Sequence, residues 1–253
     1  MRLDLQKASL SKRLPAWMLD TILLVVLATA LAALLSFALG YDGYSQQLQA
    51  AYDKYETIYG VDFDLTQEEQ EKLTDEQKEL YQQAFDALNK DSEALRAYNM
   101  MLSLTLVILS LSILLSYVVL EFIVPLLFNN GQTVGKKIFN IALMRTDGVR
   151  VTPFMLFVRS ILGKYTLETM VPILILVMMA LGVVGIGGTL LLAVLLLAQV
   201  GLLLANRNRS VIHDLLACTV AVDNESQMMF DTPEALLDYQ KRIHAEEAAN
   251  SDY

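Results

Sequence analysis

Three long blocks of apolar residues without a single charge decide what this chain can fold into. They run over Thr21–Tyr41, Ala97–Leu120 and Thr169–Ala205. Each of the first two has the length of one membrane-spanning helix, because about 20 apolar residues cross a hydrocarbon core of about 30 Å. The third has 37 residues, and one helix of that length would measure about 55 Å. A cluster of glycines at its middle predicts a turn between two shorter helices: Gly182, Gly185, Gly187 and Gly188.

Composition agrees with four membrane spans. The chain is 55% hydrophobic with a mean hydropathy of +0.43, and its apolar residues are gathered in blocks rather than spread at amphipathic spacing. A cleaved signal peptide is the competing interpretation of the first block, but that block is too long and three more spans follow. We therefore expect an all-α integral membrane protein in the lipid bilayer.

The positions of Lys and Arg predict its orientation in the cell membrane, because cytoplasmic loops are rich in both. Segment 42–96 holds fourteen acidic and five basic residues and should face outward. Basic residues instead gather in the N-terminal segment, between spans two and three, and after span four, which places both termini in the cytoplasm. They are Arg2, Lys7, Lys12 and Arg13, then Lys136, Lys137, Arg145, Arg150, Arg159 and Lys164, then Arg207 and Arg209.

The outward segment reads as a small helical insert. Residues 66–69 and 74–77 both match the capping box, so a helix should begin near Thr66 and another near Thr74. The stretch that starts at Asp62 resembles a calcium loop, but Gln67 stands where such a loop needs glycine, and Leu73 where it needs a bidentate acid. We therefore expect no metal ion and no cofactor there.

The connection between spans two and three is the most distinctive stretch. Residues 138–143 read as a strand, Asp147-Gly148 as a hairpin turn and 149–151 as the returning strand. An amphipathic segment from Thr152 to Lys164 should then lie in the membrane surface, with its basic side chains at the headgroups. The spacing of a phosphate-binding loop is absent, which argues against nucleotide binding.

Ionisable residues near the membrane boundary are the candidate functional groups. Asp20 heads the first span, with Arg13 two helical turns before it on the same face. Such a group is costly in lipid unless it is paired or hydrated. The two residues either form a functional site or an interfacial ion pair that fixes the depth of the helix. Glu121, Asp214 and His213 should reach the same side, where neighbouring carboxylates would couple their protonation.

Several of these residues together resemble the RDD family of membrane proteins, which is named for one arginine and two aspartates. The resemblance covers Arg13 to Val222 and leaves out the insert and the acidic tail. Arg13 and Asp20 match the named arginine and first aspartate, and Asp214 is the best match for the second. The other family-motif residues are Gly131, Gln132, Thr133, Gly135, Lys136 and Arg159.

The chain departs from the family pattern at two places. Many relatives carry an aspartate shortly after the arginine that Arg159 matches, and here Glu168 is the candidate substitute, with a shift of register. Cys218 stands where a glycine is usual, and we expect it to be a buried structural thiol. As the only cysteine it excludes an internal disulfide.

The resemblance implies transport of small ions or solutes, with cation/proton exchange as the most concrete form. Asp20 and Glu121 would be the acids that alternately bind a proton and an ion, with Arg13 tuning them. Four spans make a thin pathway, so we expect a homo-oligomer. The alternative is a membrane scaffold or regulator whose insert binds a partner. No nucleophile, metal spacing or cofactor loop points to an enzyme, and nothing points to nucleic acid.

The predicted fold is thus four transmembrane helices, an extracytoplasmic acidic helical insert and a small cytoplasmic β-hairpin. The expected segments are 1–41 (N-terminus and first span), 42–96 (insert), 97–128 (second span), 129–168 (hairpin and interfacial helix), 169–205 (third and fourth spans), 206–222 (membrane-proximal segment) and 223–253 (acidic tail, with a helix opening at Pro233).

Overall fold

The apolar blocks form long helices in a computed structural model of the protein, which describes residues 5–128, 130–205 and 210–251. Within these residues, four helical stretches are long and apolar enough to cross a bilayer. Their large apolar side chains are widely exposed, with Phe37 at 84% and Ile186 at 80%, as expected of surfaces that face lipid. The four stretches are Leu10–Ala38, Ser92–Leu127, Pro153–Ala180 and Gly185–Leu202.

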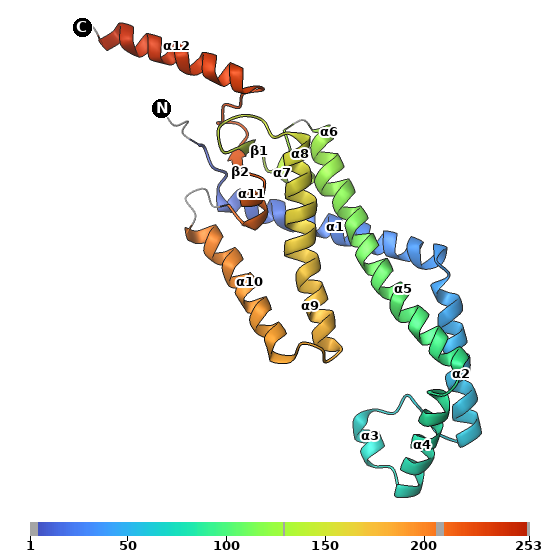
Figure 1. Ribbon diagram of the computed structural model, residues 1–253. Helices are drawn as coiled ribbons and strands as arrows, with labels where there is room; N and C mark the ends of the chain where they lie inside the picture. Colours follow the sequence, from blue (N-terminus) through green and yellow to red (C-terminus); the bar gives the residue numbers. More distant parts are fainter. Residues whose placement is uncertain (1–4, 129, 206–209, 252–253) are drawn as a thin grey trace. The chain divides into compact units, whose positions relative to one another are not determined.

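The chain divides into two compact units, which are described separately. One is Thr29–Ser112, and the other joins the residues up to Ala28 to those from Ile113 onward. The first unit holds the end of α1 and the start of α5, with three helices between them (Figure 1). Their bounds are α1 Leu10–Ala38, α2 Tyr41–Tyr59, α3 Gln67–Glu71, α4 Asp75–Leu88 and α5 Ser92–Tyr117.

Local hydrogen bonds define the helices of the insert. The predicted capping boxes are confirmed, and they start α3 after Thr66 and α4 after Thr74. Asp91 accepts from the backbone amide of Glu93 at 2.9 Å and so caps α5, while its other oxygen receives Lys54 Nζ at 3.2 Å from α2. Backbone and side-chain donors around the Asp91 carboxylate lower its pKa to about 2.

In the second unit, two spans contain π-helical segments, and each segment ends two residues before a proline. Pro125 and Pro172 each lack the amide hydrogen that would bond the carbonyl four residues earlier, which belongs to Glu121 and Glu168. Ser160 Oγ donates to the freed Glu121 carbonyl at 2.5 Å. The elements are η1 Val118–Ile123 and α6 Val124–Leu127, then α8 Pro153–Phe157, η2 Val158–Met170 and α9 Val171–Ala180.

The third span begins earlier than predicted. The segment expected to lie in the membrane surface is continuous with the span, from Pro153 to Ala180. Its basic side chains lie inside the protein, since Arg159 is 3% exposed and Lys164 pairs with the buried Glu121. The predicted glycine turn is confirmed, with Gly182 at φ +72°, and α9 lies beside α10, Gly185–Ala205 (Figure 1).

A two-stranded sheet replaces most of the predicted hairpin. β1, Ile141–Arg145, pairs antiparallel with the distant β2, Thr219–Asp223. The start of the predicted strand belongs instead to helix α7, Val134–Ile138. A remnant of the hairpin persists as a single bridge between Met144 and Arg150. β2 and the bridge use different edges of β1, because Met144 pairs with both Val220 and Arg150. The side chains of β1 at 141–144 and of β2 at 219–222 are buried in the core.

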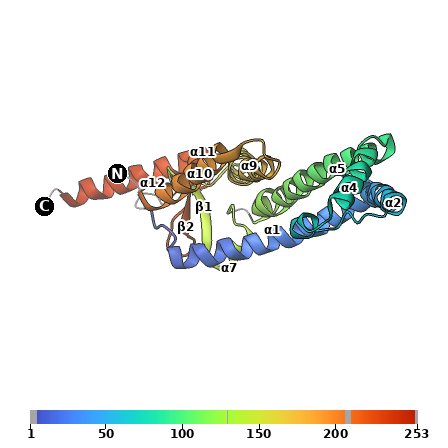
Figure 2. The same cartoon turned by 90° about the horizontal axis from the view of Figure 1, so that it is seen from below.

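The chain ends of this unit meet at the sheet. Ala8 N donates to Ala221 O at 3.2 Å, so the segment before α1 extends the edge of β2. Figures 1 and 2 both place the sheet beside the start of α1 and beside α11, Ile212–Leu216. Helix α12, Pro233–Ser251, begins at the predicted proline. Arg2, Arg207 and Arg209, which contributed to the predicted orientation, lie outside the described residues.

Cys218 differs from the buried thiol that the sequence predicts, and its backbone conformation is one that favours glycine. It is exposed rather than buried, and it joins α11 to β2 with φ +51°. A left-handed backbone favours glycine, because a side chain there is strained. This geometry accounts for the glycine that relatives are expected to carry at this position.

Candidate functional site

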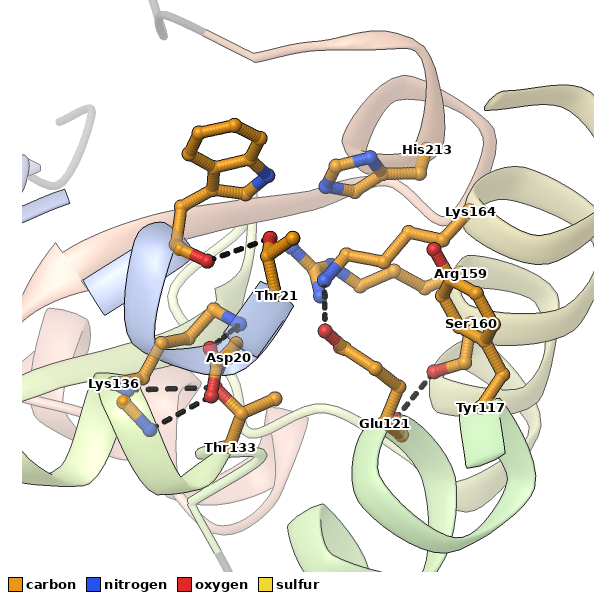
Figure 3. Close-up of polar contacts among 12 residues, drawn as sticks. Asp20, Thr21, Tyr117, Glu121, Thr133, Lys136, Arg159, Ser160, Lys164 and His213 are labelled. Atoms are coloured by element: carbon orange, nitrogen blue, oxygen red, sulfur yellow. Dashed lines mark hydrogen bonds and ion pairs between the residues drawn. The ribbon is translucent and has the colours of Figure 1, made fainter. Parts of the chain in front are cut away.

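Asp20, on α1, holds the connection between spans two and three by hydrogen bonds. Its Oδ2 accepts from Thr133 Oγ1 at 2.5 Å, and its Oδ1 accepts from the backbone amide of Gly135 at 2.7 Å (Figure 3). A side chain at Gly135 would collide with the backbone oxygen of Ala16 and lie 2.9 Å from Asp20. The carboxylate therefore anchors the first turn of α7, and glycine permits that approach.

The Arg13–Asp20 pair expected from helical spacing is wrong. Within the described residues, Asp20 has Lys136 Nζ as its nearest cation, at 3.9 Å, and the ion pair of Arg13 is with Asp214 at 3.7 Å. Arg13 and Asp20 both lie on α1, but they contact different elements of the structure. α7 covers Asp20, while α11 faces Arg13.

The rest of the 131–136 motif fixes the same connection. Gln132 Nε2 donates to the carbonyl of Ile141 at 2.8 Å, which ties the loop to β1. Gly131 has φ +62°, and a Cβ there would lie 2.8 Å from Val151. Lys136 Nζ donates to Thr133 Oγ1 at 3.1 Å, so the motif residues act on each other as well as on Asp20.

Asp214 is the most enclosed acid of the site. Arg159 approaches its Oδ1 with Nε and Nη2, both at 2.9 Å, and Thr219 donates to the same oxygen at 3.2 Å. Its Oδ2 is buried and lacks a hydrogen bond among the described contacts, with Arg13 at ion-pair range. Burial would raise the pKa of Asp214, but Arg159, His213 and Arg13 outweigh burial and hold that pKa well below its usual range.

His213 fastens α11 to the third span. Its Nδ1 lies 2.8 and 2.7 Å from the two carboxylate oxygens of Glu168, and its backbone amide donates to Glu168 at 3.0 Å. A Cβ at Gly163 would lie 2.5 Å from the His213 Cβ, so the two elements are in direct contact. Burial lowers the pKa of His213, with Arg159 adding to the effect and Asp214 opposing it. Glu168, which is predicted to replace an aspartate of the relatives, pairs with the His213 imidazole and also hydrogen-bonds to the side chain of Gln199.

Glu121 lies inside the second span and faces the third. Its Oε1 receives Lys164 Nζ at 2.5 Å, and both side chains are largely buried, with Glu121 6% exposed and Lys164 12% (Figure 3). Glu121 Oε2 is also buried, and no hydrogen-bond partner for it lies among the residues that the structure describes. A half-satisfied carboxylate in a membrane span is costly, so this oxygen is a candidate position for a further ligand.

Lys136 lies 3.9 Å from Asp20 of the first span and acts electrostatically on Glu121 of the second. Its side chain is 11% exposed, and it feels Asp20 and Glu121 together with the cations Lys164 and Arg159. Burial, aided by Lys164 and Arg159, lowers the pKa of Lys136 to about 7 against the pull of the two acids. The pKa of this lysine therefore lies well below that of a lysine in water.

The structure thus joins all five predicted cluster residues and adds others that the sequence interpretation assigned elsewhere. Lys164, which the amphipathic pattern predicts at the membrane surface, belongs to this cluster, as do Ser160 and Thr219. One signal was available: Glu121 and Glu168 each stand four residues before a proline within an apolar stretch. That spacing marks both the π-helical distortion and the acids that it carries.

Comparison with known proteins gives one match. A family model described as the RDD family matches residues 7–218. The match includes the whole charged cluster, and it excludes β2 and α12. No curated protein and no solved structure matches the chain.

Proposed function

The chain belongs to the RDD family, and from this premise we propose that it moves a small cation across a membrane in exchange for protons. One observation carries the proposal. Glu121 lies within a span. One of its oxygens is paired with Lys164, and the other is buried and has no hydrogen-bond partner in the described part of the chain. Both residues lie on π-helical segments, which occur frequently at functional sites.

The proposed roles of the two acids differ. Both oxygens of Asp20 already accept hydrogen bonds, from Thr133 and Gly135, so Asp20 positions α7. The free oxygen belongs to Glu121, which we assign as the cation-binding acid. The proposed activity is transport and involves no covalent chemistry. Four spans alone enclose only a narrow pathway, so we propose that a homo-oligomer completes it.

The proposed orientation has both termini in the cytoplasm of a cell and the insert outside. Two observations support it. The segments before α1 and after α11 hydrogen-bond to each other through Ala8 and Ala221, so they lie on one side of the membrane. The basic residues between spans two and three pack at the same end, as Lys136 against Asp20 illustrates.

The test is flux in liposomes that contain the purified protein and a pH-sensitive dye. Gradients of Na⁺, K⁺ or Li⁺ are imposed on wild type, Glu121→Gln and Asp20→Asn. We expect cation-dependent proton flux in wild type and its loss in Glu121→Gln, because an amide cannot neutralise a cation. Glu76→Gln, which changes an exposed acid of the insert, should match wild type and serves as the control.

Two results would contradict the proposal at different levels. Absence of cation-dependent flux from well-folded wild type removes the exchange function. Unchanged flux in Glu121→Gln would be compatible with the exchange function but would contradict the assignment of Glu121 as the cation-binding acid. Asp20→Asn should reduce flux through misplacement of α7, and its thermal unfolding temperature should fall as well.

A membrane scaffold remains the second candidate, and the insert favours it. α2 and α4 pack against each other, and the edge-to-face rings of Tyr52, Phe63 and Tyr81 hold the intervening loop, with centroids 5.5 Å apart at each contact. A self-contained unit of this kind suits a partner-binding role. Deletion of residues 42–90 should abolish crosslinking to a partner and leave flux intact if the two functions are separate.

A further inference from the structure

The charges that surround Glu121 are unbalanced. Lys164 pairs with it directly, and Lys136 and Arg159 lie close enough to act on it electrostatically. A further cation at the free oxygen of Glu121 would therefore meet three positive charges. In a buried setting this repulsion is strong, so binding becomes favourable when one of those charges leaves.

The three cations differ in how firmly their charge is held. Arg159 makes two contacts of 2.9 Å to Asp214, and a guanidinium does not lose its proton in proteins. Lys164 contacts the Glu121 carboxylate at 2.5 Å. Lys136 has a neutral hydroxyl at 3.1 Å, and its nearest carboxylate oxygen lies at 3.9 Å. Its ammonium is the least compensated of the three.

We propose that Lys136 carries the exchanged proton, and that its ammonium gives this proton to solvent when a monovalent cation binds at the free oxygen of Glu121. The inference rests on the proposed exchange function. One positive charge enters the cluster and one leaves, so the net charge stays constant. The neutral amine that remains keeps two N–H donors, so it can still donate to Thr133 Oγ1, whose own hydrogen goes to Asp20.

The groups facing Lys136 support this assignment. They are Asp20 from α1, Glu121 from η1, and Arg159 and Lys164 from η2. Their combined effect with burial places its titration near pH 7, in the range where an exchanger must gain and lose protons. Lys137, the next residue, is exposed and stacks on the ring of Phe128 at 3.8 Å, which makes it a matched control.

The experiment measures cation affinity and proton release together in detergent-solubilised full-length protein, in weak buffer, with Na⁺, Li⁺ and K⁺ as the added ions. Apparent affinity in wild type should rise about tenfold per pH unit below pH 7 and level off above it, because one proton competes with one cation. Lys136→Arg should bind weakly at every pH, since its charge cannot leave. Lys136→Gln should bind tightly at every pH, since its charge is already gone.

Lys137→Arg should behave as wild type. Two results overturn the inference while leaving exchange in place. One is a pH dependence of the cation affinity that persists in both Lys136 variants. The other is a Lys136→Gln variant that binds the cation as weakly as Lys136→Arg. If wild type carries no flux, exchange fails, and proton release on adding the ions still decides the role of Lys136. Nitrogen NMR of the lysine side chains provides a readout in unmutated protein: the Lys136 signal should titrate near neutrality and move to lower pH with cation, and an unmoved midpoint contradicts the proposal.

Discussion

At the residue scale, the site consists of buried charges, each held by a partner on another element. Arg159 and Asp214 are the clearest case, at 4% and 1% side-chain exposure. Such a pair adds little net stability when complete, because desolvation opposes the attraction. Its loss is costly, because the buried Asp214 carboxylate would keep only the Thr219 hydroxyl at 3.2 Å and Arg13 at 3.7 Å in place of the two contacts of 2.9 Å from Arg159.

Replacing Arg159 by Gln should therefore lower the free energy of unfolding by about 3–5 kcal/mol. The matched control is Arg150→Gln, which breaks an ion pair to Asp231 whose side chains are 43% and 73% exposed. That change should cost less than about 1 kcal/mol. Thermal unfolding in detergent compares the two, and equal shifts would contradict the buried role of Arg159.

A second residue-scale prediction concerns Gly163, where α11 touches η2. Gly163→Ala should destabilise the protein by about 1–3 kcal/mol, because the new methyl group would overlap His213. Gly187→Ala is the control, since nothing lies within 4 Å of a Cβ there. Hydrogen exchange should quicken at residues 212–216 only in Gly163→Ala. Unchanged protection there would argue against direct packing.

At the element scale, the sequence predicted those features that depend on local pattern. Apolar length gave the spans, and the hydroxyls of Thr66 and Thr74 gave two helix starts. Features set by distant partners were missed. The strand at 141–145 could have paired with either neighbour, and only the fold brings β2 to it. Arg13 was paired with Asp20 because both lie on one helix face, whereas α7 and α11 determine what each one meets.

The insert gives an element-scale prediction with a pH dependence. The pKa of Asp91 falls from its ordinary value near 3.8 to about 2 on folding. Its stabilising contribution is therefore complete above about pH 4 and is lost as pH falls through 2. Hydrogen exchange at the start of α5 should accelerate over that range in wild type. Asp91→Asn should start less protected and show a smaller acid response, and an identical response would contradict the role.

At the scale of the whole molecule, the testable property is topology. In a Cys218→Ser background, a membrane-impermeant thiol reagent should label Glu76→Cys from outside intact cells, because that position is exposed in the insert. Ser226→Cys, exposed after β2, should be labelled only after the cells are opened. Labelling of both from outside would remove the proposed orientation.

The pairing of β1 with β2 also has a consequence for biosynthesis. The ribosome completes the strand at 141–145 and the Arg159 helix before it makes residues 212–223, which carry Asp214 and the second strand. Until residues 212–223 are made, the preceding part of the chain has an unpaired edge on the strand at 141–145, and the Arg159 guanidinium lacks the Asp214 carboxylate. A chain truncated before residue 212 keeps both defects permanently, which makes it a natural substrate for membrane quality control.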